Sequence, residues 1–130
     1  FGPKNAKLDD PFDASIVHGA NVVRALLSAQ PPERDDYRLF YNINFPPVPA
    51  DQVLGQRIVR QGRRQGSNFS AHPHKTASGR EFLFIQGGDQ HVPADPDTDV
   101  QSNLEGYISV TPLRADMTAY DALDHFSMDT

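Results

Sequence analysis

Apolar residues recur at helical spacing between residues 13 and 29. Residues three or four positions apart lie on one face of a helix, so this pattern predicts a helix with a broad apolar stripe. The stripe comprises Ile16, Val17, Ala20, Val23, Leu26 and Leu27. Asp13 can cap the helix by accepting an N–H from its first turn. Pro31-Pro32 ends the pattern, because proline cannot continue a helix.

Alternating apolar and polar residues predict a strand over residues 38–45. One face of this strand would carry Leu39, Tyr41, Ile43 and Phe45. The other face would carry Phe40, Asn42 and Asn44. A helix followed by an aromatic-rich strand is typical of an α/β unit.

Two further runs predict a long hairpin. Residues 56–62 form a weak strand around Ile58-Val59, and residues 82–85 form a short apolar run that ends at Gly87-Gly88. Such a run is usually buried on both sides. The polar segment 63–80 between the two runs would form the tip of the hairpin.

The remainder reads as an acidic loop, a strand and a short helix. Residues 89–104 contain Pro93 and Pro96 and predict a loop. Residues 106–111 alternate and predict a strand that ends at Pro112. Residues 118–126 predict a last helix, which Asp116 or Thr118 could cap.

Composition narrows the possible functions. A chain of 130 residues is long enough for one small domain or part of a larger one. The net charge of −5 argues against binding to nucleic-acid polymers or anionic membranes, although a small phosphate ligand needs only a local site. The absence of cysteine excludes disulfides and thiol nucleophiles and suits a cytoplasmic protein. The start at Phe1-Gly2-Pro3 leads us to expect a truncated, cleaved or partial chain.

Several segments, taken in order, resemble the SurE (survival protein E) family. Residues 39–46, Leu-Phe-Tyr-Asn-Ile-Asn-Phe-Pro, resemble the family strand "LNINVP". Residues 106–113, Gly-Tyr-Ile-Ser-Val-Thr-Pro-Leu, followed by Asp116-Met-Thr118, resemble its signature "GYVSITPL…D-L-T". Ile58-Val59-Arg60-Gln61-Gly62 is similar to the strand that leads into the family's protruding hairpin, and Thr98-Asp99 to a "TD" pair before the signature.

This resemblance implies the C-terminal half of a Rossmann-type α/β/α fold with a protruding β-hairpin arm. Residues 1–55 would end the α/β core, residues 56–88 would form the arm, and residues 89–130 would supply a loop, a strand and a terminal helix. SurE-like proteins are 5'-nucleotidases that hydrolyse nucleoside monophosphates, use a divalent metal (Mg or Mn), and form dimers or tetramers. The family's metal ligands lie upstream of the matched region, so we expect this chain alone to be inactive.

Two residues are candidates for contact with the substrate. Asn44 lies near the carboxyl end of its strand, where ligands bind in open α/β sheets. It could line a pocket, or its amide could order the Pro46-Pro47 turn. Asp99 matches the family's "TD" pair and could position substrate, or it could belong to an ordinary polar loop.

Other polar clusters each have a simpler interpretation. The paired carboxylates Asp9-Asp10 lack a preceding buried strand. The acidic triplet at positions 95, 97 and 99 lacks the glycine and glutamate of a calcium loop. His72, His74 and His91 could bind a transition metal or simply lie in loops. The four arginines at positions 57, 60, 63 and 64 could contact a phosphate, or form a solvated or subunit-contacting arm.

Two functional classes remain open. The first is half of a metal-dependent nucleotidase, whose apolar surfaces the other half would cover. The alternative is a non-catalytic α+β module for association or ligand binding that folds by itself. The sequence encoded before Phe1 would distinguish them.

Overall fold

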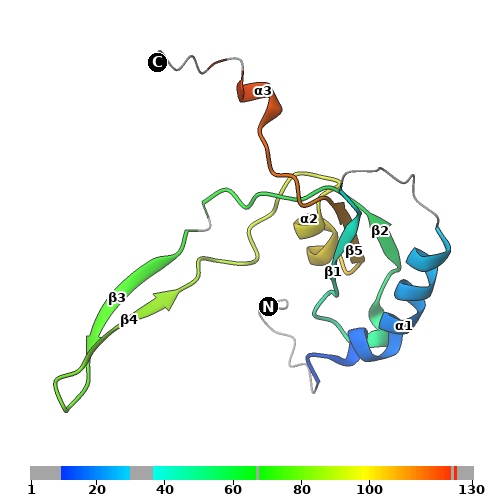
Figure 1. The fold of residues 1–130 in the computed structure, drawn as a ribbon. Coiled ribbons are helices and arrows are strands. Elements are labelled where there is room, and N and C mark those ends of the chain that lie inside the picture. Colours follow the sequence, from blue (N-terminus) through cyan, green and yellow to red (C-terminus); the bar gives the residue numbers. More distant parts are fainter. Residues whose placement is uncertain (1–9, 30–36, 67, 124, 126–130) are drawn as a thin grey trace.

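The computed structural model describes residues 10–29, 37–66, 68–123 and 125 (Figure 1). The elements in chain order are α1 (Asp13–Ser28), β1 (Phe40–Asn44), the 3-10 turn η1 (Ala50–Gln52), β2 (Gln56–Ile58), β3 (Ser70–Lys75), β4 (Glu81–Gln86), α2 (Asp99–Leu104), β5 (Ile108–Leu113) and α3 (Tyr120–Leu123). The fold is a mixed α/β body with a separate two-stranded hairpin.

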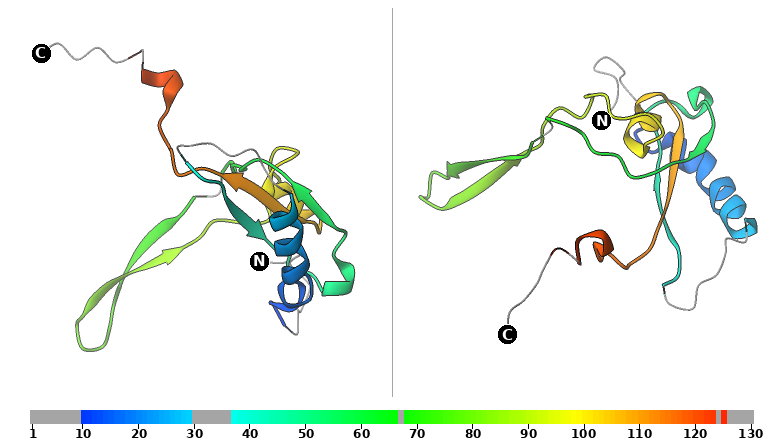
Figure 2. Two further views of the ribbon diagram at one scale, coloured as in Figure 1. Left: turned by 45° about the vertical axis from the view of Figure 1, so that its right-hand side comes forward. Right: turned by 90° about the horizontal axis from the view of Figure 1, so that it is seen from above.

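A three-stranded sheet forms the body, with β5 in the centre. β1 pairs with β5 in antiparallel register, with Ile43 opposite Val110, and β2 pairs with the other edge of β5 in parallel. α1 and α2 cover opposite faces of this sheet (Figure 2). The strand predicted at 38–45 and the one predicted at 106–111 are thus neighbours, and the second continues through Pro112 to Leu113.

The apolar core lies between α1 and the sheet. Val22, Ile108 and Val110 are buried together. The partly buried residues packed against them are Leu26, Tyr41, Ile43, Phe45 and Val53. Tyr41, Ile43 and Phe45 were predicted to share one face of their strand, and the core confirms this, because side chains of a strand alternate between faces.

The predicted helix at 13–29 is present, and most of its predicted apolar stripe does not pack on the sheet of this chain. Val22 and Ala14 are buried, whereas Ile16, Val23 and Leu27 are exposed to 69%, 49% and 79%. α1 therefore carries two apolar stripes on opposite sides, and only one contacts the sheet. Periodicity alone could not tell which stripe would be covered.

The start of α1 also differs from the prediction. The N-cap position is Phe12, without a side-chain cap, and the carboxylate of Asp13 instead accepts the N–H of Ala50 at 2.7 Å. His18 Nε2 lies 2.9 Å from the carbonyl oxygen of Ala50. These two contacts fix η1 against the helix. The predicted stop at Pro31-Pro32 lies outside the described residues.

The predicted hairpin exists, and the weak strand predicted at 56–62 is present as β2, but its predicted pairing within the hairpin is wrong. β4 pairs with β3 in antiparallel register, whereas β2 belongs to the main sheet. β3 was missed because its sequence, Ser-Ala-His-Pro-His-Lys, lacks apolar alternation and contains Pro73. A two-stranded ribbon tolerates proline, since each strand has one edge without ladder bonds.

The hairpin extends away from the body (Figure 1). Every residue of β3 and β4 is exposed. The predicted burial of the run 82–85 on both sides is therefore not seen in this chain: Leu83 and Ile85 are exposed to 66% and 69%. His74 covers part of the opposite face, stacking on Phe82 with ring centres 5.7 Å apart.

The acidic segment 89–104, predicted as a loop, contains the short helix α2. Thr98 is its N-cap, and its hydroxyl accepts the N–H of Gln101 at 3.3 Å. Gly106 follows the helix with φ +90°, and Tyr107 N–H donates to the carbonyl of Ser102. This is the left-handed glycine that commonly ends helices.

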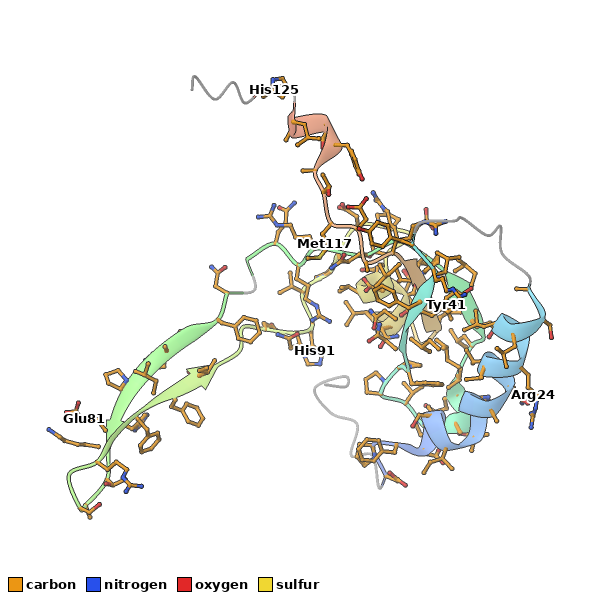
Figure 3. The ribbon with its side chains drawn as sticks, in the orientation of Figure 1. Arg24, Tyr41, Glu81, His91, Met117 and His125 are labelled. Atoms are coloured by element: carbon orange, nitrogen blue, oxygen red, sulfur yellow. The ribbon has the colours of Figure 1, made fainter. Side chains whose placement is uncertain are left out.

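The C-terminal part leaves the body after β5. α3 is shorter than the predicted 118–126, and part of that range lies outside the described residues. Asp116 accepts the N–H of Thr118 at 3.0 Å, just before the helix. Met117, labelled in Figure 3, is exposed on this segment. Within the described part of the chain, no helix has the length and apolar character needed to cross a membrane.

Candidate functional site

The connection that leads from the body into the hairpin is held against the start of α2. Arg60 forms an isolated parallel bridge with Thr98, in which its N–H donates to Asp97 and its carbonyl accepts from Asp99. Two residues later, the N–H of Gly62 donates to Asp99 Oδ1 at 2.7 Å. The chain that leads toward β3 is thereby held against the residues that begin α2.

Gly62 permits this close approach. A Cβ atom at position 62 would lie 2.8 Å from the Cβ of Thr98 and 3.0 Å from Asp99 Oδ1. Carbon atoms do not pack that closely, so any larger residue would push the two segments apart. The glycine is therefore required by the contact and not by its own backbone angles.

A cavity of about 580 Å³ lies beside this junction. One wall is the segment Gln61–Arg64, and the other consists of Phe69, Gln90 and Val100. We call it the hairpin-base pocket. Its volume falls within the roughly 300–1,000 Å³ of small-molecule sites. Gln90 precedes His91, which Figure 3 labels on the connection that returns from β4 to the body.

The guanidinium of Arg64 is held in the pocket by a hydrogen bond to Gln90. Its Nη1 donates to Gln90 Oε1, and Gln90 Nε2 donates to the carbonyl of Gly88 at 2.9 Å. The second bond orients the amide so that its oxygen faces the guanidinium. The Nε of Arg64 is buried and has no hydrogen-bond partner among the described residues.

Asp99, one of the two predicted substrate-side residues, lies at the edge of the pocket. It is only 8% exposed and begins α2. Its Oδ1 accepts from the backbone of both Gly62 and Val100, at 2.7 and 2.8 Å. Gly62 and Val100 line the pocket, so Asp99 fixes two of its wall segments. A direct role toward substrate stays a prediction.

Asn44, the other predicted residue, does not line this pocket. It lies at the end of β1, opposite Ser109, and its backbone carbonyl accepts from Asn103 Nδ2 at 3.0 Å. Asn103 also donates to the carbonyl of Tyr107. The side-chain amide of Asn103 thus joins α2 to the sheet. The predicted contact of the Asn44 side chain with substrate stays a prediction.

The four predicted arginines divide into two pairs. Arg57 donates to Glu105 at 2.6 Å, and its guanidinium lies 3.5 Å from the ring centre of Tyr107. Arg60 lies 4.0 Å from Asp95. Arg63 and Arg64 instead reach the pocket. The sequence grouped all four, because spacing does not reveal which of them already have a carboxylate partner.

The Arg57–Glu105 contact shifts both pKa values. Hydrogen bonds from Gln101 and then Arg57 hold the pKa of Glu105 below its ordinary value. The hydrogen bond to Glu105 is the main reason that the pKa of Arg57 is raised. Both groups are exposed, so this ion pair is a surface contact that links β2 to the end of α2.

The other polar clusters have local partners. Asp10 accepts the N–H of Phe12 at 2.8 Å, while Asp9 lies outside the described residues. His72 lies 3.0 Å from Ser70 Oγ, and His91 contacts Asp89. Among the residues that the structure places, no three His, Asp or Glu side chains are grouped so that they could hold a metal ion.

Comparison with known proteins places this geometry in context. The chain is 57% identical over 123 residues to a 5'-nucleotidase SurE of Roseobacter denitrificans, a match that covers 95% of this chain and 47% of the relative. A 5'-nucleotidase SurE of Ruegeria pomeroyi is also 57% identical, over 124 residues and with 48% of the relative covered. The chain is a homologue of the SurE 5'-nucleotidases. The resemblance seen in the sequence is thereby confirmed.

The chain spans about half the length of the curated SurE relatives that it matches. The crystal structure of the SurE protein from Aquifex aeolicus matches the fold with a TM-score of 0.59 and 27% identity, over 97% of this chain and 47% of that one. The mixed α/β architecture therefore corresponds to part of a SurE structure. No protein-family model matches the chain.

Proposed function

We propose that this chain is the C-terminal half of a SurE-type 5'-nucleotidase, a cytoplasmic hydrolase of nucleoside monophosphates. The observation that carries the proposal is the 57% identity over nearly the whole chain to relatives named 5'-nucleotidase SurE, of which the match covers only 47–48%. In this proposal the three-stranded sheet is one part of a larger Rossmann-type α/β/α sheet. Residues 1–55 and 89–130 belong to the core and its C-terminal extension.

The exposed apolar stripe of α1 supports the proposal that another part of the full protein packs on this helix. Ile16, Val17, Val23 and Leu27 are each about half exposed or more, yet they line up along one side of a well-formed helix. Among the described residues, the buried apolar set is small: Ala14, Val22, Val59, Ile108 and Val110. Small domains bury too little surface to be very stable. A second half packed on α1 would enlarge this core.

The hairpin supports a role in subunit association. Both of its strands are exposed throughout, and four consecutive apolar residues, Phe82–Ile85, lie on β4. Apolar surface of this kind marks interaction sites on soluble proteins. The arm, placed from the sequence at 56–88, would consist of β3, β4 and their connections and would pack on another copy in a dimer or tetramer.

The divalent metal of the proposed activity is not assigned to this chain. The described residues provide no group of three metal-ligating side chains, so the ion (Mg or Mn) would bind in the other half. The described residues do not fit such an ion, and we derive no step of the reaction through it. This half would complete the core, hold the hairpin and contribute walls to the substrate cleft.

The proposal is tested by comparing the 130-residue chain with the full natural protein that contains it. The full protein should release phosphate from AMP in the presence of Mg²⁺ or Mn²⁺, and the isolated chain should release none. Phosphate release by the isolated chain that persists through purification would contradict the proposal. A cooperative, soluble and inactive monomer of these residues would instead favour the alternative of a non-catalytic α+β module.

A further inference from the structure

One face of the hairpin carries two histidines from the same strand. His72 and His74 lie on β3 and are separated by Pro73. Alternate residues of a strand point to the same face, with their Cα atoms about 6.6 Å apart. The register places His72 opposite Phe84 and His74 opposite Phe82, and residues paired in this way share a face. Both imidazoles therefore project from one side of the ribbon that extends away from the body (Figure 1).

The side-chain contacts on this face agree with the register. His74 stacks on Phe82 with ring centres 5.7 Å apart and meets Phe84 edge-on at 5.8 Å. His72 Nε2 lies 3.0 Å from the Oγ of Ser70, which precedes it by two positions on β3. Ser70, His72 and His74 thus form a row at strand spacing beside two phenyl rings.

The charged pair of the two strands lies on the other face of the ribbon. Lys75 Nζ is 3.0 Å from the Oε1 of Glu81. Both residues occupy odd positions, as do Leu83 and Ile85, whereas the two histidines and their phenylalanine neighbours occupy even ones. A cation bound on the histidine face would therefore meet no lysine or arginine side chain of β3 or β4.

The chemistry of the histidine face suits a transition metal. Neutral imidazole binds Zn²⁺, Ni²⁺ and Cu²⁺ through a ring nitrogen, whereas Mg²⁺ and Mn²⁺ prefer oxygen ligands. When His72 Nε2 donates to Ser70 Oγ, Nδ1 keeps the lone pair that a metal needs. A hydrogen bond from the second ring nitrogen is usual in histidines that bind metal. Phe82 and Phe84 limit the orientations of the His74 ring.

We propose that His72 and His74 together bind one divalent transition-metal ion of the class that includes Zn²⁺, Ni²⁺ and Cu²⁺. Water fills the remaining coordination positions, so the ion exchanges readily with solvent. Because both rings are fixed to one strand, the second binds at a high effective concentration, and the pair holds the ion more tightly than either ring alone. The inference does not rest on the proposed nucleotidase function, since it involves neither a nucleotide nor Mg²⁺ or Mn²⁺.

The test is isothermal titration calorimetry of the full natural protein with Zn²⁺ in the presence of excess Mg²⁺. The Mg²⁺ occupies sites built from oxygen ligands. Wild type should bind Zn²⁺ at one site per chain, and H72Q and H74Q should each lower the affinity of that site at least about tenfold. The double variant H72Q/H74Q should lose the site altogether. Zn²⁺ binding that is the same in wild type and the double variant would overturn the proposal.

Two further variants show whether the shared face is what binds the ion. P73H/H74Q keeps two histidines on β3 but places them on opposite faces, and it should lose as much affinity as H74Q. H125Q removes an exposed imidazole outside the hairpin, labelled in Figure 3, and should bind Zn²⁺ like wild type. Position 73 and both hairpin histidines are exposed, so these variants should fold, as circular dichroism can verify. Binding by P73H/H74Q at the wild-type affinity would contradict chelation by one face.

Electron paramagnetic resonance of bound Cu²⁺ gives a second readout that a change in stability would not mimic. With one equivalent of Cu²⁺, wild type should show coupling to imidazole nitrogen, and this coupling should be weaker in H74Q and absent in H72Q/H74Q. A wild-type spectrum without nitrogen coupling would overturn the proposal. Phosphate release from AMP is measured separately. An inactive protein that binds Zn²⁺ and Cu²⁺ as described would count against the proposed function alone.

Discussion

The carboxylate of Asp99 accepts the backbone N–H of Gly62 at 2.7 Å, across 37 positions of sequence. This bond joins the first residue of α2 to the chain that enters the hairpin. The same oxygen accepts the N–H of Val100 at 2.8 Å. One buried side chain thus sets the spacing of the two segments that form the hairpin-base pocket.

Removing this carboxylate should destabilise the junction. We expect D99A to lower the free energy of unfolding of the full natural protein by about 1.5–3 kcal/mol, because two partly buried N–H groups lose a charged acceptor. D99N keeps an acceptor oxygen in the same place and should cost less than about 1.5 kcal/mol. Urea unfolding measures both. Equal losses of unfolding free energy in D99A and D99N would show that the acceptor oxygen of Asp99 does not stabilise the junction.

Two glycine substitutions should have opposite effects. G62A places a Cβ 2.8 Å from the Cβ of Thr98 and should cost about 1–3 kcal/mol through steric strain. G19A adds a methyl group inside α1, where the nearest atom is a Phe45 ring carbon at 3.9 Å. It should stabilise by about 0.5–1 kcal/mol, since alanine is the better helix former. Thermal unfolding of both variants checks the contrast, and a neutral G62A would contradict the close packing described.

Charges on the hairpin should weaken subunit association. The double variant L83E/I85E places two carboxylates on one exposed apolar face of β4. Sedimentation velocity should show a shift toward smaller species, while the circular dichroism of the protein stays the same. S78E, in the loop between β3 and β4, is the control for added charge. Unaltered association in the double variant would mean that this face does not form the subunit contact.

The Glu105 contact predicts a defined pH dependence. The pKa of Glu105 is lowered in the folded state, first by the hydrogen bond from Gln101 and then by that from Arg57. Its stabilising effect is therefore complete above the unfolded pKa of about 4.3 and disappears as the pH falls through the lower folded value. Wild type should be more stable than E105Q at pH 7, and this difference in the free energy of unfolding should disappear below about pH 4. A difference independent of pH would argue against ionisation as its cause.

The sequence predicted the elements whose periodicity is strong. The helix at 13–29 and the strands at 38–45 and 106–111 are confirmed, with shifts at their ends. Tyr41 and Ile43 face the core as the alternation requires. These elements could be predicted because their patterns reflect local geometry and burial together.

The missed features depend on contacts between distant segments. β3 forms only because β4 supplies its ladder partners, and the pairing of β2 with β5 could not be read from either strand alone. α2 did have a local signal, since Thr98 and Gln101 have the spacing of a capping box. Proline and aspartate around it favoured a loop instead. The exposed stripe of α1 was indistinguishable by pattern from a buried one.

The candidate site was only partly visible in the sequence. Asp99 was selected from a two-residue resemblance, and the structure places it behind the pocket wall. Arg63 and Arg64 were grouped with Arg57, whose charge is paired with Glu105. Phe69 and Gln90 could not be selected from the sequence. They line the pocket only because two segments about 20 positions apart in the chain lie on either side of it.

A chimeric enzyme tests the central claim most directly. The 123 matched residues of the Roseobacter denitrificans 5'-nucleotidase SurE are replaced by the corresponding residues of this chain. Phosphate release from AMP is then measured with Mg²⁺ or Mn²⁺. If this chain is the second half of such an enzyme, the chimera should fold and retain activity within about tenfold of its parent. A chimera that folds and associates like the parent but releases no phosphate would contradict the account.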